Sequence, residues 1–187
     1  MPFSDKDFLA LALANSVNAA ILARLPSLGA PQAHLVAGCL FQAVWNAAAG
    51  QPPGWGVKDY DVFYFDDSDL SWDAEDRVIR RAEALFADLG VTVEVRNQAR
   101  VHLWYKAHFG EDYPRLTSSR EGIDRYLIAC TCVGIEAGTG SLYAPDSLPD
   151  LQAGRLRLNP RHPQPRQFLA KAESYRARWP WLSIGPV

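Results

Sequence analysis

Two aspartates, Asp59 and Asp61, stand one residue apart in the most informative segment of the chain. The surrounding segment 57–65 is rich in aromatic and β-branched residues, which predicts a β-strand. Because alternate side chains of a strand share a face, the two carboxylates should lie side by side. Like charges held so close repel, so one carboxyl takes up a proton unless a cation lies between them. The pattern favours a divalent metal site, although an Asp-x-Asp pair alone is more often an edge-strand or turn feature.

The segment before this strand predicts a turn that suits a phosphate. Residues 34–37 form a short apolar strand closed by Gly38, and a helix should follow from about 40 to 49. A strand that turns into a helix presents free backbone N–H groups, and small residues there let phosphates approach closely. Gly38 alone is also compatible with a simple tight turn.

A third carboxylate follows in the next predicted strand, where valines alternate with polar residues over 91–96. Its Glu94 either faces solvent or completes a two-metal site, and it is also placed to deprotonate an acceptor hydroxyl. Mg²⁺, or Mn²⁺ in its place, binds one or two carboxylates together with water and substrate phosphates. The set therefore predicts in-line attack on a nucleoside triphosphate (NTP), with pyrophosphate leaving.

Three short segments together resemble the signature of the nucleotidyltransferase superfamily with the polymerase-β-like fold: 36–39, 59–62 and 93–95. Longer blocks resemble a bacterial nucleotidyltransferase-like family over about residues 34 to 180: 43–46, 58–66 and 95–105. The resemblance implies an α+β fold, in which a mixed β-sheet with flanking helices carries a C-terminal α/β extension.

By this resemblance, Gly38 and Cys39 are phosphate-turn positions, Asp59 and Asp61 the metal pair, and Glu94 the third carboxylate. Two departures keep an alternative open. The superfamily usually has Gly or Ser where Cys39 stands, and residues 51–56 lengthen the gap before the aspartates. The alternative is a catalytically degenerate nucleotide-binding or regulatory protein on the same fold.

The polar segment that follows Glu94 supplies a further candidate. A helix is expected over 98–108, and the four-residue spacing of Arg96 and Arg100 would suit one helix face, so Arg100 is a candidate phosphate ligand. A helix cap with solvated charges explains the same residues equally well. Lys58 should point to the strand face opposite the aspartates and receives no role.

The aromatic residues divide between core and ligand candidates. Trp45 and Trp104 are expected in the core, whereas Trp55, in the loop before the acidic strand, is the better candidate for ligand contact. The remaining expected elements are helices over 4–25, 72–89, 119–129 and 168–178, and a hairpin of 130–136 with 142–144.

Length and charge narrow the function further. A chain of 187 residues suits one domain, with an N-terminal helix over 4–25, a core over about 34–110 and an extension over about 111–187. The net charge of -2 favours a small-molecule or protein acceptor over long nucleic acid. Three irregularly spaced cysteines indicate reduced thiols in a cytoplasmic protein, and the polar interruptions of segment 8–25 argue against a membrane span.

The sequence thus predicts a Mg²⁺-dependent nucleotidyltransferase that moves a nucleoside monophosphate (NMP) from an NTP onto an acceptor hydroxyl or phosphate. A metal-dependent phosphoesterase is a further alternative.

Overall fold

A five-stranded mixed β-sheet, in the order β3-β2-β1-β4-β5, is the framework of the computed structural model, which describes residues 3–146 and 148–187. β2 and β3 pair in parallel, while β1 pairs with β2 and β4, and β4 with β5, in antiparallel orientation. The strands are β1 His34–Val36, β2 Asp59–Tyr64, β3 Thr92–Asn97, β4 Gly134–Glu136 and β5 Leu142–Tyr143. The mixed sheet with flanking helices confirms the predicted α+β class.

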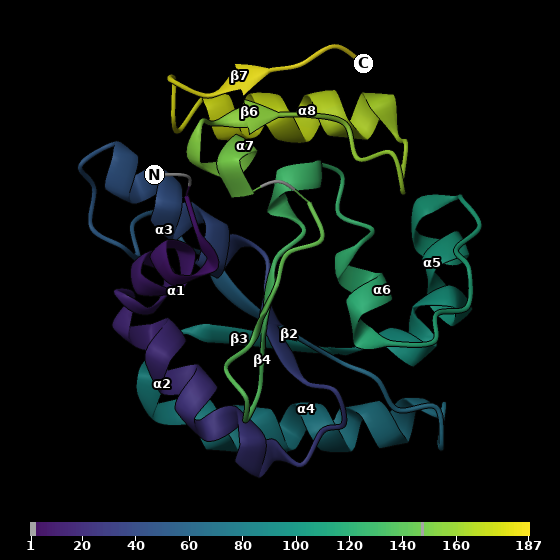
Figure 1. Ribbon diagram of the computed structural model, residues 1–187. Coiled ribbons are helices and arrows are strands. Elements are labelled where there is room, and N and C mark those ends of the chain that lie inside the picture. Colours follow the sequence, from purple (N-terminus) through teal and green to yellow (C-terminus); the bar gives the residue numbers. More distant parts are fainter. Residues whose placement is uncertain (1–2, 147) are drawn as a thin grey trace.

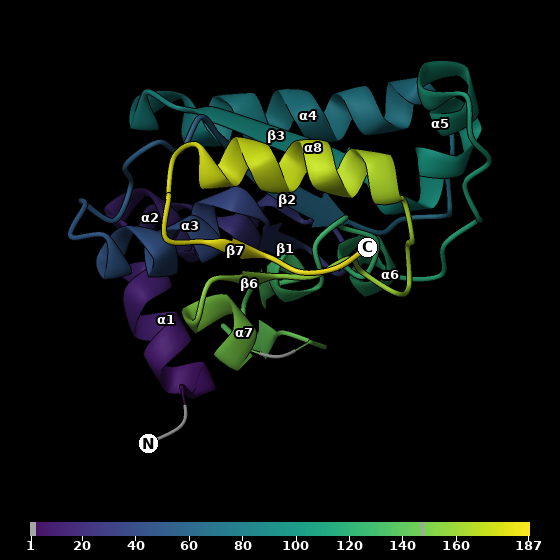
Figure 2. The ribbon, with the colours of Figure 1, turned by 90° about the horizontal axis from the view of Figure 1, so that it is seen from above.

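Helices enclose this sheet, with α4 and α8 at opposite ends of the molecule in Figure 1. Seen from above, α8 runs across the sheet beside α3 and above β2 (Figure 2). The helices are α1 Asp5–Leu13, α2 Ser16–Arg24, α3 Gly38–Ala48, α4 Trp72–Phe86, α5 Val101–Phe109, α6 Ser119–Ile123, α7 Leu148–Gln152 and α8 Pro165–Arg176. Near the C-terminus, β6 Arg155–Leu156 pairs in parallel with β7 Ser183–Ile184.

The helix that follows β1 is the most buried element. Every residue of α3 from Cys39 to Asn46 is buried, which its apolar composition allows on all sides. Trp45, fully buried as expected, packs edge-on against Trp179, and its indole N–H donates to the Leu151 carbonyl. These contacts of Trp45 join α3 to the C-terminal part of the chain.

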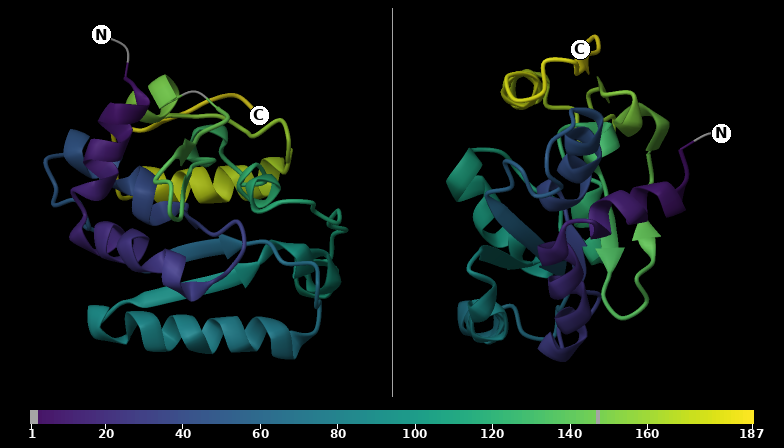
Figure 3. Two further views of the ribbon diagram at one scale, coloured as in Figure 1. Left: turned by 60° about the horizontal axis from the view of Figure 1, so that its bottom comes forward. Right: turned by 90° about the vertical axis from the view of Figure 1, so that its left-hand side faces the viewer.

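The predicted single helix over 4–25 is wrong, because the chain bends by 99° between α1 and the segment from Ser16 to Leu28. Asn15 causes the break: its side-chain oxygen accepts from the Val17 N–H and caps α2, while its amide contacts the Tyr60 hydroxyl. Figure 3 shows α1 and α2 as separate helices on one side of the sheet. Ser4 begins α1 with a capping box: its hydroxyl oxygen accepts from the Asp7 N–H, and the Asp7 carboxylate accepts from the Ser4 N–H.

Several other boundaries also differ from expectation. The predicted helix over 119–129 ends at Ile123, and a 3₁₀ turn over Ala129–Thr131 delays the hairpin until Gly134. Trp104 is half-buried and packs among aromatic neighbours on α5 instead of in the main core. Within residues 3–146 and 148–187, no single helix combines the length and apolar character needed to cross a membrane.

Asn46 should be a stability determinant, because its fully buried amide joins three parts of the chain. Its nitrogen donates to the carbonyls of Pro53 and Trp55, and its oxygen accepts from the Trp179 indole. Asn46→Leu should lower the free energy of unfolding by about 2–4 kcal/mol, since buried polar partners lose their hydrogen bonds. Urea denaturation measures this. The exposed control Gln51→Leu should change it by less than about 0.5 kcal/mol, and equal effects would contradict the assignment.

Candidate active site

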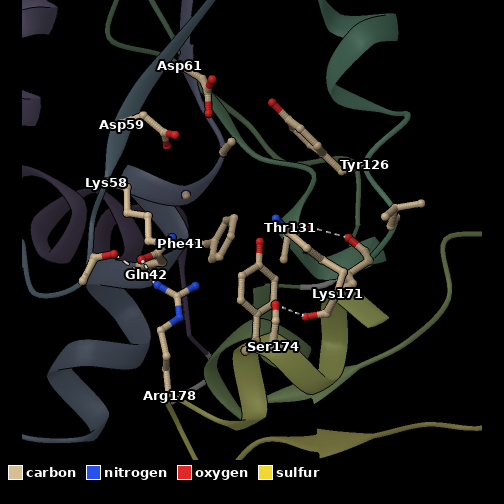
Figure 4. Close-up of a pocket in the computed structure, with 16 residues that line it drawn as sticks. Phe41, Gln42, Lys58, Asp59, Asp61, Tyr126, Thr131, Lys171, Ser174 and Arg178 are labelled. Atoms are coloured by element: carbon tan, nitrogen blue, oxygen red, sulfur yellow. Dashed lines mark hydrogen bonds between the residues drawn. The ribbon is translucent and has the colours of Figure 1, made fainter. Parts of the chain in front are cut away.

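A cleft of 580 Å³ opens between β2, the start of α3 and the inner face of α8. Figure 4 shows the two aspartates on one side and the side chains of α8 on the other, facing them. The segment that follows α6 closes a third side. The polar lining residues are Gln42, Lys58, Asp59, Asp61, Tyr126, Thr131, Lys171, Ser174, Tyr175 and Arg178.

The carboxylates gather on one face of the parallel pair β2 and β3. Asp59 and Asp61 both line the cleft, and Asp61 lies directly opposite Glu94 in the strand register. Glu94 is outside the cleft lining; its side chain is 43% exposed and pairs with Arg96, at 3.4 Å between Oε2 and Nη2. The structure thus brings the predicted aspartates together, with Glu94 beside them on the neighbouring strand.

The proximity and burial of these carboxylates change the pKa of Asp61. Burial, followed by the negative charges of Asp59 and Glu94, raises the pKa of Asp61 to about 7. Among the described residues, no hydrogen-bond donor contacts the side chain of either aspartate. The exposed Asp59 and half-buried Asp61 therefore face the cleft with carboxylate oxygens that no protein donor among the described residues contacts.

These carboxylates fit a divalent cation that shares its coordination with substrate. In the described part of the chain, no three His, Cys, Asp or Glu side chains form a complete metal cage. Mg²⁺ needs none, because one or two carboxylates suffice when water and phosphate oxygens complete its shell. A cation between Asp59 and Asp61 would offset both the burial and the repulsion that raise the Asp61 pKa. We expect those two side chains to hold it.

The turn from β1 into α3 places backbone N–H groups at the same cleft. Ala37 has φ 63° and ψ -135°, an uncommon conformation that redirects the chain abruptly. The helix then begins at Gly38, which lines the cleft. The Leu40 and Phe41 N–H groups donate to the Ala37 carbonyl, which leaves the N–H groups of Gly38 and Cys39 without a partner within the helix. Such groups, with the positive end of the helix dipole, favour an anion.

Cys39 can take part in this turn only through its backbone. Its side chain is 1% exposed and its thiol donates to the Val36 carbonyl, with 3.3 Å between Sγ and O. Burial raises the pKa of the Cys39 thiol well above its usual value, so it stays protonated. A hydroxyl contact to phosphate from this position is therefore replaced by core packing.

Three cations that the sequence did not predict also line the cleft, two of them on the side opposite the aspartates. Lys171 and Arg178 come from α8 and the turn that follows it, and Lys58 comes from the residue before β2 (Figure 4). Arg178 donates to the Gln42 side-chain oxygen at 3.3 Å and the Gly56 carbonyl at 3.1 Å. These contacts fix the guanidinium at the cleft edge.

Each of these omissions has a physical reason. Lys58 precedes the first paired residue of β2, so strand alternation does not govern its direction. Lys171 and Ser174 lie three residues apart on one face of α8, and Arg178 follows four residues later in the turn after the helix, in continuation of that face. That spacing is a usable signal, but nothing local indicates that this face meets the aspartates.

Arg100, the candidate phosphate ligand, lies outside the cleft. It is 7% exposed, its guanidinium pairs with the buried Glu75 of α4, and its Nε donates to the Leu70 carbonyl at 2.9 Å. The 3₁₀ turn over Gln98–Arg100 directs the side chain toward α4, away from β2. Trp55 is likewise absent from the lining, because its ring packs edge-on against Trp179.

Comparisons with known proteins agree with this geometry. A family model described as nucleotidyltransferase matches residues 23–184. A solved structure described as an NMR structure that reveals a CCA-adding enzyme head domain superposes with a TM-score of 0.76. It shares 21% sequence identity, and the match covers 98% of this chain and 97% of that one, so it shows the fold. A search of curated proteins gave no match.

The raised pKa of Asp61 predicts a pH-dependent loss of stability in the absence of divalent cations. The folded-state pKa of about 7 exceeds the ordinary 3.8, so the folded state binds more protons between these values. The free energy of unfolding should consequently fall from pH 4 to pH 7 and then level off.

Asp61→Asn should abolish this decline, which makes it more stable than wild type by about 2–4 kcal/mol at pH 8 and nearly equal at pH 4. Urea denaturation in EDTA at both pH values measures the difference. The control Asp67→Asn alters an exposed carboxylate and should keep the wild-type pH profile. A decline that persists in Asp61→Asn would refute the electrostatic assignment.

Arg100→Met should unfold the protein more easily without altering the cleft. It leaves the Glu75 carboxylate buried without its partner, which costs about 3–5 kcal/mol. The double variant Arg100→Met/Glu75→Leu should recover part of this loss. The folded fraction of Arg100→Met, assayed at low temperature, should bind NTP with an affinity within about twofold of wild type. A selective loss of NTP affinity would return Arg100 to the phosphate-binding set.

Proposed function

Since this chain belongs to the nucleotidyltransferase family, we propose that its cleft transfers an NMP from an NTP onto an acceptor hydroxyl, with Mg²⁺ or Mn²⁺ bound and pyrophosphate released. One observation carries the proposal. The paired carboxylates Asp59 and Asp61 face Lys171 and Arg178 across a single cleft, with the first turn of α3 between them. This arrangement suits a metal–triphosphate complex, because the carboxylates on one side can bind the metal while the cations and N–H groups on the other side can bind the outer phosphates.

The donor is held by groups from three segments. Asp59 and Asp61 hold the metal, which neutralises charge on the carboxylates and on the phosphates. The N–H groups of Gly38 and Cys39 bind the phosphate oxygens, and Lys58, Lys171 and Arg178 bind the outer phosphates. Since these residues span positions 38 to 178, the chain acts as one domain.

Positioning and proton transfer complete the reaction. The acceptor oxygen forms a bond to the α-phosphorus, the bond from that phosphorus to the bridging oxygen breaks, and pyrophosphate leaves with the electron pair. Glu94, half-exposed beside Asp61, either joins the metal ligands or accepts the acceptor's proton. The net charge of -2 favours a small-molecule or protein acceptor.

Pyrophosphate release from NTP should depend on a divalent cation and on both aspartates. Asp59→Asn and Asp61→Asn should each reduce it to background, because each removes a charged metal ligand. A coupled pyrophosphate assay with four NTPs and a panel of acceptors measures this, with Asp67→Asn as control. Metal-dependent NTP binding without turnover would favour the catalytically degenerate alternative. Release of inorganic phosphate without acceptor modification would indicate a phosphoesterase.

The cations of α8 should act on donor binding. Arg178→Gln and Lys171→Met should each weaken Mg²⁺–NTP binding by about 10–100-fold, since a charge-assisted contact to phosphate is lost. Isothermal titration calorimetry measures this. The matched control Arg176→Gln changes an arginine of the same helix that pairs with Glu173 at the surface. Equal effects of all three variants would show that general charge on α8, not the cleft, determines affinity.

A further inference from the structure

A second pocket of 170 Å³ adjoins the cleft and differs from it in chemistry. Aromatic rings and arginines line it, chiefly Phe63, Arg96, Tyr105, Tyr113, Arg125 and Tyr126. Its volume is small compared with typical drug-sized sites of about 300–1,000 Å³, so it encloses one planar group of a ligand whose other groups extend past its rim, where the Arg96 side chain is 44% exposed.

The strand register connects this pocket to the carboxylates. Phe63 follows Asp61 on the same face of β2, and Arg96 follows Glu94 on the same face of β3. Phe63 and Arg96 are register partners, as are Asp61 and Glu94. Tyr126 lines both the cleft and the pocket, and its ring stands across from Asp61 in Figure 4. A ligand in the pocket would therefore reach the carboxylates from the side away from α8.

The pocket presents flat rings together with positive charge. Tyr126 stacks on Phe63 with 5.9 Å between ring centroids, and the guanidinium of Arg125 lies 4.5 Å over the ring of Tyr113. Such surfaces bind planar rings by stacking, and guanidinium groups bind anionic oxygens.

Two lining residues also carry buried polar atoms that lack partners. Among the described residues, neither the Tyr126 hydroxyl nor the Nε of Arg125 makes a hydrogen bond. Buried polar groups in native proteins are nearly always satisfied, so such atoms at a pocket indicate a polar ligand.

We propose that this pocket is the acceptor subsite and that the acceptor is a nucleoside monophosphate, an inference that rests on the proposed function. The base stacks among Phe63, Tyr113 and Tyr126, and the phosphate binds Arg96 and Arg125. A ribose hydroxyl faces Asp61 and Glu94, attacks the α-phosphorus of the donor and gives up its proton to Glu94. Pyrophosphate leaves, and the products are a dinucleotide and pyrophosphate.

The donor base is the competing occupant, and the positions of the charges argue against it. The cations suited to a triphosphate line the 580 Å³ cleft on the α8 side, whereas the aromatic pocket lies beyond the aspartates along β2 and β3. Two separate basic groups on either side of one carboxylate cluster match two anionic substrates.

Binding of AMP to protein saturated with Mg²⁺ and the non-hydrolysable donor α,β-methylene-ATP tests the inference. AMP should bind this complex, and ribose 5-phosphate, which lacks the base, should bind at least about 10-fold more weakly. Arg125→Gln and Tyr113→Leu should each weaken AMP binding by about 10-fold and leave the affinity for α,β-methylene-ATP within twofold. The matched control Arg120→Gln removes a guanidinium that lies 5.1 Å over Tyr143, outside the pocket, and should change neither affinity.

The remaining outcomes separate the two proposals. Displacement of AMP by α,β-methylene-ATP would assign the pocket to the donor base and overturn the acceptor inference alone. Equal binding of AMP and ribose 5-phosphate, or unchanged AMP affinity in both pocket variants, would also overturn it. Failure of α,β-methylene-ATP itself to bind with Mg²⁺ would refute the proposed function and the acceptor subsite together.

Discussion

Repulsion among carboxylates on one face of β2 and β3 is the constraint around which the rest of the structure is arranged. Parallel pairing in this register sets Asp61 beside Glu94, and alternation sets it beside Asp59, so burial there is unfavourable without a cation. The sheet tolerates this because the surrounding elements are strongly fixed. α3 is buried over almost its whole length, and the ion pair of Glu75 with Arg100 anchors the end of β3 to α4. A metal ion bound by Asp59 and Asp61, as proposed, would offset this unfavourable burial.

Two of the three positive charges that line the cleft come from a part of the chain distant from the carboxylates. Lys58 immediately precedes β2, whereas Lys171 and Arg178 arrive on the C-terminal helix and its following turn. The buried aromatic cluster of Trp45, Tyr175 and Trp179 places α8 against α3, and Arg178 is then held by Gln42. Hydrophobic packing therefore determines where the cationic side of the cleft lies.

Much of the framework could be predicted from sequence because its signals are local. The aromatic and β-branched residues of 57–65 and the alternation in 91–96 identified the two strands, and the change from an apolar strand to Gly38 identified the turn. The break at Asn15 was missed because the apolar repeat continues through it, while the competing cap and the contact with Tyr60 are tertiary. Arg100 was misplaced for the same reason, since its partner Glu75 lies on another element. The roles of Asp59, Asp61 and Glu94 stay predictions, with a geometry that is compatible with them.

The contribution of α8 has a consequence for biosynthesis. During translation, both aspartates and the α3 turn are synthesised more than one hundred residues before Lys171, because they precede it by that distance in the sequence. The carboxylate face can pair its strands early, yet the half of the cleft suited to the outer phosphates is missing until α8 docks. Under the proposed function, a nascent chain that still lacks α8 also lacks Lys171 and Arg178, and it should bind nucleotide only weakly.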